Sequence, residues 1–345
     1  MAEPRKRRRN GGRGGHARSA PLFAVLDLGT NNCRLLIARP EQHGKFRVID
    51  SFSRIVRLGE GMVQTGNLTP AAIDRTIAAL KICGARIRAK QVTQVRAIAT
   101  EACRQALNTQ TLIARAQAEA GIALTVLTCD EEASLAAAGC APLIDPRFDG
   151  ALIFDIGGGS TEAIWMQRKN GKAEVRKAVS VPAGVITIAE RQPGAMTRAR
   201  YDAIRAQMLD VFAGVRRAMD KVGSFDPATH HLLGTSGTVT TLAGIALGLP
   251  RYNRAKVDAS WHHSADILKI AEDIADFDVA QRASLGCVGR DRAGLIVPGC
   301  AIFSAIVAQW PCAQLRVADR GLREGMLRQM MDAPDGTKKP MTQKT

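Results

Sequence analysis

The stretch FAVLDLGTNNCRLLIA, residues 23–38, places a carboxylate and a polar turn between two apolar runs. The first run reaches Asp27, and the second resumes after a glycine and three short polar residues. The same layout returns in LIFDIGGGSTEAIWM, residues 152–166, with Asp155 before the turn. Apolar runs of this length, broken by glycine and polar residues, are typical of two strands joined in a hairpin. Two such hairpins in one chain indicate a repeated unit.

The order of predicted elements supports that repeat. Strands are predicted at 22–28, 34–39 and 46–52, and a helix follows with Thr69 as N-cap and Pro70 in its first turn. From residue 150 the order restarts, with strands at 151–156, 162–168 and 173–180 and helices near 199–221. Duplicated units of this size predict two similar lobes with a cleft between them. A chain of 345 residues is also long enough for two domains.

Composition narrows the class of protein. Hydrophobic residues make up 46% of the chain, which is typical of a globular protein, and no apolar run reaches the ~18 to 20 residues of a membrane span. The basic start has no apolar stretch behind it, so it does not resemble a secretory signal. The eight cysteines are scattered without a C-x-x-C pair. Reduced thiols in a cytoplasmic protein are therefore expected, rather than a zinc site or a disulfide framework.

The net charge of +16 points to an anionic partner. Residues 1–20 hold seven Arg or Lys against one Glu, so the rest of the chain carries +10. The N-terminal tail is either a disordered, solvated segment or an arm for nucleic acid or another polyanion. The excess charge on the rest of the chain suits an enzyme with a strongly negative substrate.

The two hairpin tips do not fit the common nucleotide-binding loops. A Rossmann fingerprint or a P-loop requires a helix after the glycine turn, whereas here a strand follows each tip and neither has a P-loop lysine. Two tips facing each other would offer backbone N–H groups to a phosphate chain from both sides. Asp27 and Asp155 precede the tips and are placed to hold Mg²⁺. The alternative for each single Asp–Gly turn is ordinary turn chemistry.

Seven motifs lie along the chain in this order: VLDLGTNNCRLLIA, ATEACRQALN, DEEASLAAAG, IFDIGGGSTEAI, GTSGTVTTLAG, VPGCAIF and GLREGML. Together, from about residue 22 to 330, they resemble the Ppx/GppA family of exopolyphosphatases and guanosine pentaphosphate phosphatases, within the actin-like ATPase superfamily. The resemblance implies an α/β fold of two ribonuclease H-like lobes with an interdomain cleft. It also resembles the short form of the family, without a further helical module.

The same resemblance sets the expected domain boundaries. Domain I spans 21–135, and a C-terminal helix at about 321–333 packs back onto it. Domain II spans 136–320. Residues 1–20 are expected to form a disordered basic tail and residues 334–345 a flexible one.

Two residues receive catalytic roles from the resemblance. Glu132, the second glutamate of DEEAS, matches the general base of the family, and Arg104 matches its phosphate-binding arginine. Without the family, acids that open a helix would simply complement the helix dipole, and Arg104 would be a solvated helix residue. The sequence departs from the family at Ser134, where an arginine is usual, which removes one cationic contact.

The resemblance also implies a metal site and a phosphate cradle. Asp155 and Glu162 match the acids that hold Mg²⁺, and Asp27 takes the analogous place in the other lobe. A monovalent cation such as K⁺ accompanies Mg²⁺ in some relatives. The phosphate-binding residues are expected at the three turns: Thr30, Asn31, Asn32, Gly157, Gly158, Gly159, Ser160, Thr161, Ser236 and Gly237.

The expected activity is release of terminal orthophosphate from inorganic polyphosphate by a Mg²⁺-dependent exopolyphosphatase. Guanosine pentaphosphate is the alternative substrate, alone or in a dual activity. A nucleotide-polyphosphate phosphotransferase, or a polyphosphate-binding regulator without turnover, is the alternative from another class. A cytoplasmic homodimer is expected, with no membrane partner and with nucleic acid only through the N-terminal tail. The His230–His231 and His262–His263 pairs lack metal-ligand spacing and are interpreted as structural.

Overall fold

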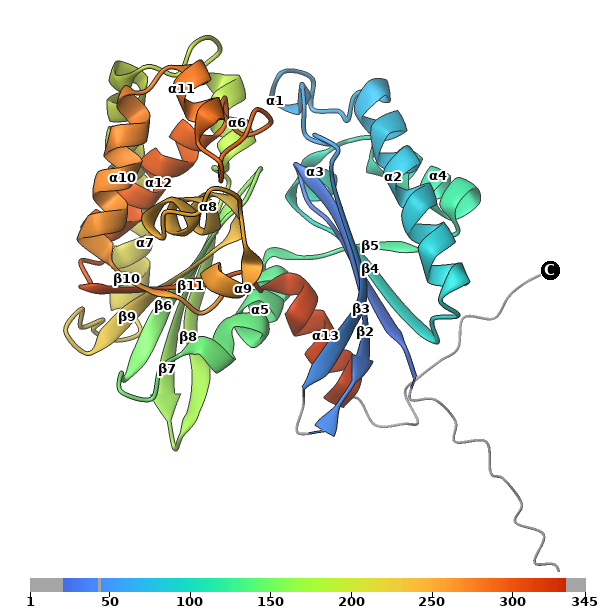
Figure 1. The fold of residues 1–345 in the computed structure, drawn as a ribbon, viewed down its shortest axis with the longest axis horizontal. Helices are drawn as coiled ribbons and strands as arrows, with labels where there is room; N and C mark the ends of the chain where they lie inside the picture. The colour runs from blue at the N-terminus through green and yellow to red at the C-terminus, as the bar shows by residue number, and fades with distance from the viewer. Residues whose placement is uncertain (1–20, 43–44, 333–345) are drawn as a thin grey trace, which may run out of the picture.

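Two β-sheets, one in each half of the chain, build two lobes that lie side by side (Figure 1). The computed structural model describes residues 21–42 and 45–332. The two tails predicted at 1–20 and 334–345 lie outside the described residues. The predicted α/β architecture of two lobes is confirmed.

The first sheet has five strands in the order β3-β2-β1-β4-β5. Strands β1 to β3 form an antiparallel meander, and β4 and β5 run parallel to β1. The strands span β1 (Phe23–Leu28), β2 (Asn32–Pro40), β3 (Phe46–Ile55), β4 (Gln94–Ala99) and β5 (Leu124–Val126). The helices of this half are α1 (Met62–Thr65), α2 (Pro70–Ala89), α3 (Glu101–Gln105), α4 (Thr109–Arg115), which continues into a π-helical turn (Ala116–Ala120), and α5 (Cys129–Cys140), followed by a 3₁₀ turn (Ala141–Leu143).

The second sheet repeats the first with one strand added, in the order β10-β11-β9-β6-β7-β8. Its strands span β6 (Gly150–Ile156), β7 (Thr161–Lys169), β8 (Lys172–Val181), β9 (His230–Thr235), β10 (Trp261–His263) and β11 (Gln314–Ala318). The helices of this half are α6 (Val185–Arg191), α7 (Arg198–Asp220), α8 (Ser236–Ala246), α9 (Arg254–Val257), α10 (Ser264–Asp276), α11 (Val279–Ser284), α12 (Ile296–Gln309) and α13 (Leu322–Asp332).

The two-residue period of the strands decides which way the key carboxylates face. On β1, Leu26 packs into the core beside α2, while Val25 packs beside α13. On β6, Phe154 packs into the core of α7 and α12, while Ile153 packs beside α5. Asp27 and Asp155 share a strand face with Val25 and Ile153, because successive side chains point to opposite faces. Both aspartates therefore lie on the side of their sheet that faces the other lobe.

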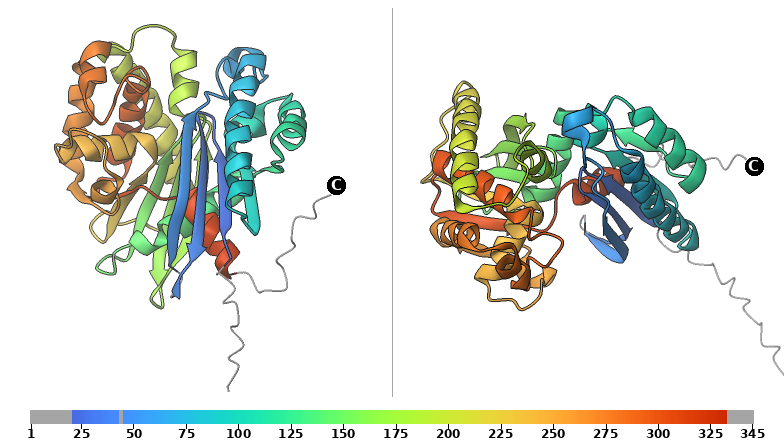
Figure 2. Two further views of the ribbon diagram at one scale, coloured as in Figure 1. Left: turned by 45° about the vertical axis from the view of Figure 1, so that its right-hand side comes forward. Right: turned by 90° about the horizontal axis from the view of Figure 1, so that it is seen from above.

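Helices α5 and α13 form the seam between the lobes (Figure 2). After β11 in the second sheet, α13 returns to pack against α5 and β1, as the resemblance implies. Glycines permit the close approach: a Cβ on Gly139 would lie 2.1 Å from the Gly321 carbonyl oxygen, and a Cβ on Gly325 would lie 2.0 Å from that of Leu135. The predicted boundary between residues 135 and 136 falls inside α5.

One detail of the sequence interpretation changes. The GTSGT segment was predicted as a glycine-rich turn before a helix, but β9 ends at Thr235 and α8 begins at once with Ser236. The turn is compressed into one residue, because Ser236 has a φ of 76°. The first histidine pair begins β9 directly after a turn, and the Nε1–H of Trp165 donates to Nε2 of His230 at 3.2 Å.

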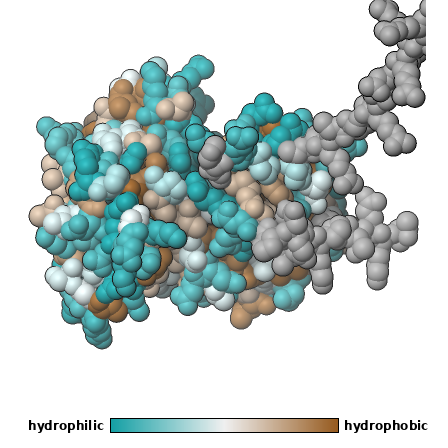
Figure 3. All heavy atoms as spheres, turned by 90° about the horizontal axis from the view of Figure 1, so that it is seen from below, coloured by the Kyte–Doolittle hydropathy of each residue, from teal (hydrophilic) through white to brown (hydrophobic). Residues whose placement is uncertain are grey.

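The outer surface is mostly hydrophilic on the face shown in Figure 3. Within residues 21–42 and 45–332, no helix combines the length and the apolar character needed to cross a bilayer.

Candidate active site

The two hairpin tips meet at the bottom of the cleft. A Cβ added to Gly159 would lie 2.6 Å from Oγ1 of Thr30 and 2.9 Å from Cγ of Glu101. A Cβ on Gly158 would lie 3.1 Å from Cβ of Thr30. The second tip therefore needs glycine, because any side chain would push the lobes apart. Farther up the cleft, the backbone N–H of Gly61 donates to Oε1 of Glu190 in the other lobe at 2.7 Å.

A cavity of about 90 Å³, here the small cavity, lies between these tips. It brings together nearly all of the residues that the sequence assigned to the site. The lining includes Asp27, Thr30, Asn31, Asn32, Glu132, Asp155, Gly157, Gly158, Gly159, Ser160, Glu162 and Ser236. These residues come from both halves of the chain, so the site exists only where the lobes meet.

Glu132 points into the small cavity because its neighbour caps the helix. Glu131 and Thr128 form a capping box at the start of α5, with the Thr128 N–H donating to Oε2 of Glu131 at 2.8 Å. Glu132, one position on, is only 5% exposed and accepts a hydrogen bond from Nη1 of Arg104 at 2.9 Å. Burial raises the pKa of Glu132 to about 7, although the Arg104 charge opposes this rise.

Arg104 is placed beside the small cavity rather than in its lining. Its Nε donates to Oε2 of Glu101 at 3.0 Å, and its Nη1 also donates to the Leu127 carbonyl oxygen at 2.9 Å. The sequence interpretation missed Glu101, which is buried and lines the cavity. The signal was the spacing of three residues between Glu101 and Arg104, which puts both on one side of α3.

The carboxylates predicted to bind a metal face one another across the β6–β7 hairpin. Asp155 lies directly opposite Glu162, and directly opposed side chains share a sheet face. Oε1 of Glu162 accepts from the hydroxyls of Ser160 at 2.7 Å and Ser180 at 2.9 Å. Burial raises the pKa of Asp155 to about 6, and that of Glu162 well above its usual range. Burial likewise raises the pKa of Asp27.

This donor set suits a magnesium ion. Mg²⁺ takes one or two carboxylates and fills its other positions with water and substrate phosphate oxygens. Asp155 and Glu162 provide two such carboxylates, and a cation would remove the cost of burying their charge. Over the described part of the chain, no three His, Cys, Asp or Glu side chains are arranged to hold a metal ion by themselves. The residues therefore fit an ion that keeps part of its coordination shell for water and substrate.

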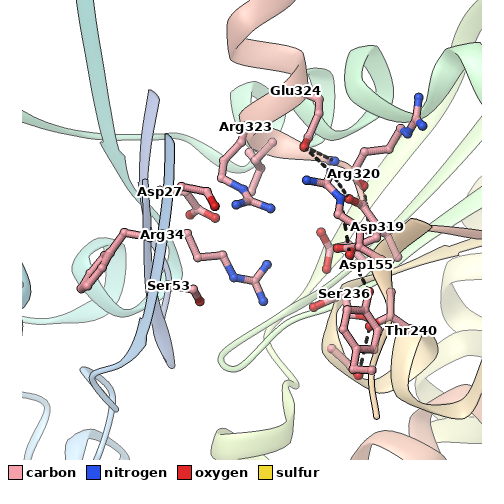
Figure 4. Close-up of a pocket in the computed structure, with 18 of the residues that line it drawn as sticks. Asp27, Arg34, Ser53, Asp155, Ser236, Thr240, Asp319, Arg320, Arg323 and Glu324 are labelled. Carbon is pink, nitrogen blue, oxygen red and sulfur yellow. Dashed lines mark hydrogen bonds and ion pairs between the residues drawn. The ribbon is translucent and has the colours of Figure 1, made fainter. Parts of the chain in front are cut away.

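Two predicted cradle residues lie elsewhere. The Thr161 side chain is fully buried, and its hydroxyl donates to the Ala183 carbonyl oxygen at 2.7 Å, away from the small cavity. Gly237 lines a second cavity of about 430 Å³, here the large cavity, and Ser236 lines both. The large cavity shares Asp27 and Asp155 with the small one (Figure 4).

The sequence interpretation also missed the arginines of the large cavity, which come from four different parts of the fold: Arg34, Arg254, Arg292, Arg320 and Arg323. The position of one of these arginines could have been predicted from the sequence. Arg34 stands directly opposite Asp27 in the β1–β2 hairpin, so counting residues along the hairpin places both side chains on the same face.

Comparisons with known proteins agree with this geometry. The model of the Ppx/GppA phosphatase family matches residues 36–333. Exopolyphosphatase 2 of Mycobacterium tuberculosis is 28% identical over 317 residues, which cover 88% of this chain and 96% of that protein. The crystal structure of the Aquifex aeolicus member of the Ppx/GppA family superposes with a TM-score of 0.74 at 28% identity, covering 90% of this chain and 97% of that one.

An exopolyphosphatase structure from Cytophaga hutchinsonii gives a TM-score of 0.80 at 24% identity, over 90% of this chain and 98% of that one, which supports the fold alone. The expected actin-like fold is confirmed. The family match covers most of the chain. The chain therefore belongs to the Ppx/GppA phosphatase family, and it is an enzyme that hydrolyses phosphoanhydride bonds.

Proposed function

We propose that this enzyme is an exopolyphosphatase, which releases the terminal orthophosphate from inorganic polyphosphate. The observation that best supports this proposal is the position of Glu132, a buried acid in the same small cavity as both glycine-bearing tips. A general base must reach the attacking water, and a pKa of about 7 leaves part of the Glu132 side chain ionised at neutral pH. The homologous exopolyphosphatase 2 supports the same substrate class.

The tips are suited to bind the terminal phosphate. Backbone N–H groups in a turn form a concave anion site, and the two tips close on it from opposite lobes. The N–H of Gly157 is already used, since it donates to the Ser160 carbonyl oxygen at 2.9 Å. Gly158 and Gly159 are the residues at the contact between the tips, and they carry no side chain that would displace a phosphate oxygen. Their backbone is therefore the best candidate for the phosphate cradle.

Arg104 and Glu132 have different roles in the proposed reaction. Arg104 can bind phosphate oxygens only by exchanging its carboxylate partners for them, and Glu132 accepts the proton of the water that attacks the terminal phosphorus. Asp155 and Glu162 would hold Mg²⁺, with Asp27 facing it from the other lobe. When bound, the ion would offset the negative charge of the phosphate oxygens.

Guanosine pentaphosphate is the second candidate substrate. The observation in its favour is the large cavity, which adjoins the small one and includes the ring of Tyr252, a surface on which a base could stack. The arginines that dominate the same cavity favour a longer phosphate chain instead. A cytoplasmic homodimer is part of the proposal; light scattering of the purified protein checks the dimer, and cell fractionation checks the location.

The test is orthophosphate release from polyphosphates of several lengths and from guanosine pentaphosphate, with and without ADP. We expect release from polyphosphate that does not depend on ADP. Turnover of guanosine pentaphosphate alone would make the enzyme a guanosine pentaphosphate phosphatase instead of an exopolyphosphatase. Transfer of phosphate to ADP would instead make the enzyme a phosphotransferase.

A further inference from the structure

The large cavity continues from the small cavity toward the C-terminal helix. The two cavities share Asp27, Arg34, Asp155, Ser236 and Leu322, whereas Glu132 lines only the small one. A ligand whose last phosphate lies beside Glu132 therefore has room to extend into the large cavity. The volume of about 430 Å³ exceeds what one phosphate needs.

Two of the four acids of the large cavity, Asp319 and Glu324, already have partners in the protein. Asp319 accepts from the Tyr252 hydroxyl at 2.5 Å, and its Oδ2 lies 3.5 Å from Nε of Arg254. Glu324 accepts from the Gly321 N–H and from Nη2 of Arg254, both at 2.9 Å. Arg254 is thus neutralised by its neighbours. Arg320 is neutralised as well, by an ion pair with Asp258.

Among the residues that the structure describes, the other three arginines of the large cavity have no such carboxylate partner. Nη1 of Arg292 donates to the Thr241 hydroxyl at 3.0 Å. Arg34 and Arg323 are the remaining two. Neither makes an ion pair with any residue in 21–42 or 45–332, and both point toward the space between the lobes (Figure 4).

Arg323 is half-buried at the start of α13. Burial lowers the pKa of Arg323, and the nearby Arg34 charge acts in the same direction, whereas the Glu324 and Asp27 charges oppose this fall. Two like charges directed into one cavity are costly unless an anion enters between them.

The acid that stands near both arginines is Asp27, which is one of the carboxylates facing the metal position. Asp155 also lies near Arg34, and Glu324 also lies near Arg323, so each arginine faces carboxylates without forming an ion pair with them. The guanidinium groups of Arg34 and Arg323 are thus not held by an ion pair and can bind a phosphate unit that carries a negative charge of its own.

Packing fixes Arg323 relative to the candidate base. Arg323 lies on α13 and Glu132 on α5, and these helices touch through the glycine contacts at Gly139 and Gly325. A Cβ at either glycine would lie within 2.1 Å of a backbone oxygen of the facing helix. The spacing between Glu132 and Arg323 is therefore set by backbone contact rather than by flexible side chains.

We propose that the large cavity binds the phosphates that precede the terminal one, and that Arg323 is the residue that grips them. The inference rests on the proposed function for the identity of the ligand. Arg323 binds non-terminal phosphate with its guanidinium, from a helix that is locked to the helix of Glu132. The C-terminal helix thus aligns the chain so that its last phosphate reaches the base.

Binding measurements test this directly. Isothermal titration of the full chain, in a Glu132→Gln background that stops turnover and in the presence of Mg²⁺, compares tripolyphosphate with inorganic phosphate. Arg323→Met should weaken tripolyphosphate binding by about tenfold or more, since charged hydrogen bonds are lost. Inorganic phosphate, which needs only the small cavity, should bind almost as before. Arg323→Lys should recover part of the affinity, because it keeps the charge but not the fork.

The control is Arg328→Met, which removes the same charge from the same helix outside both cavities. It should leave both affinities unchanged. Equal loss of tripolyphosphate and inorganic phosphate binding in Arg323→Met, or equal loss in Arg328→Met, would overturn the inference in favour of a structural role. If the wild-type enzyme hydrolyses polyphosphate but Arg323→Met leaves tripolyphosphate binding unchanged, the inference is overturned and the proposed function stands. If tripolyphosphate binding depends on Arg323 but the wild-type enzyme hydrolyses no polyphosphate, the binding site is supported and the proposed function is refuted.

Discussion

The carboxylate of Glu132 and the guanidinium of Arg104 are joined by a hydrogen bond of 2.9 Å, and the other side of the same guanidinium holds Glu101. Arg104 is therefore shared between two buried acids. A phosphate that enters the small cavity competes for this guanidinium. The pair links substrate binding to the protonation of the base, because Arg104 opposes the rise in the pKa of Glu132 that burial causes.

The pH dependence of catalysis should report that link. Glu132 accepts a proton only when ionised, and its ionised fraction grows as the pH passes its pKa of about 7. The value of kcat/KM should therefore rise across this range. Removing the Arg104 charge raises the pKa further, so Arg104→Met should move the rising limb to higher pH as well as lower its height. A limb at the same pH in both proteins would show that Arg104 does not act on the base.

The contact between the hairpin tips gives a prediction on geometry. A methyl group at Gly159 would lie 2.6 Å from Oγ1 of Thr30, so Gly159→Ala must push the tips apart. Because a misplacement near 1 Å can cost ~10²-fold in rate, kcat/KM should fall by that order. Gly214→Ala in α7 is the matched control, since its Cβ meets only the end of Arg217 at 3.8 Å, and its activity should stay at the wild-type level. Similar activities of the two variants would mean that the closed tips are not needed.

The carboxylate pair gives a prediction on metal dependence. Asp155→Asn removes one charge of the proposed Mg²⁺ site while keeping the shape of the side chain. The Mg²⁺ concentration that gives half-maximal activity should rise, and EDTA should abolish the activity of the wild-type enzyme until Mg²⁺ is restored. Asp74→Asn, on the exposed face of α2, should behave like wild type. Full activity in EDTA would show that hydrolysis does not need a metal ion.

The sequence predicted what short-range patterns determine. The alternation in residues 23–38 and 152–166 gave both hairpins, and with them Asp27, Asp155 and the glycine tips. Glu132 was correctly expected in the first turn of a helix. The T-x-x-E spacing of Thr128 and Glu131 is a sequence signature of a capping box, and it would have distinguished the capping Glu131 from Glu132. Only the structure shows that Glu132 faces the cavity.

The large cavity could not be predicted in the same way. Arg254, Arg292 and Arg323 are far apart in the chain, and each is an ordinary charged residue in its local context. They share one cavity only because β11 leads into α13, which crosses back to β1. The compressed turn at Ser236 was missed for a different reason, since a positive φ at a serine leaves no mark in the sequence.

The activity of Glu132→Gln tests the central claim most directly. The substitution keeps the shape of the side chain but cannot accept a proton, so the rate of orthophosphate release from polyphosphate should fall by ~10² to 10⁴-fold while polyphosphate binding remains. Glu131→Gln, which still caps α5, should keep wild-type turnover. A Glu132→Gln enzyme that retained more than about half of the wild-type kcat would contradict the assignment of Glu132 as the base, because general-base catalysis contributes at least ~10²-fold.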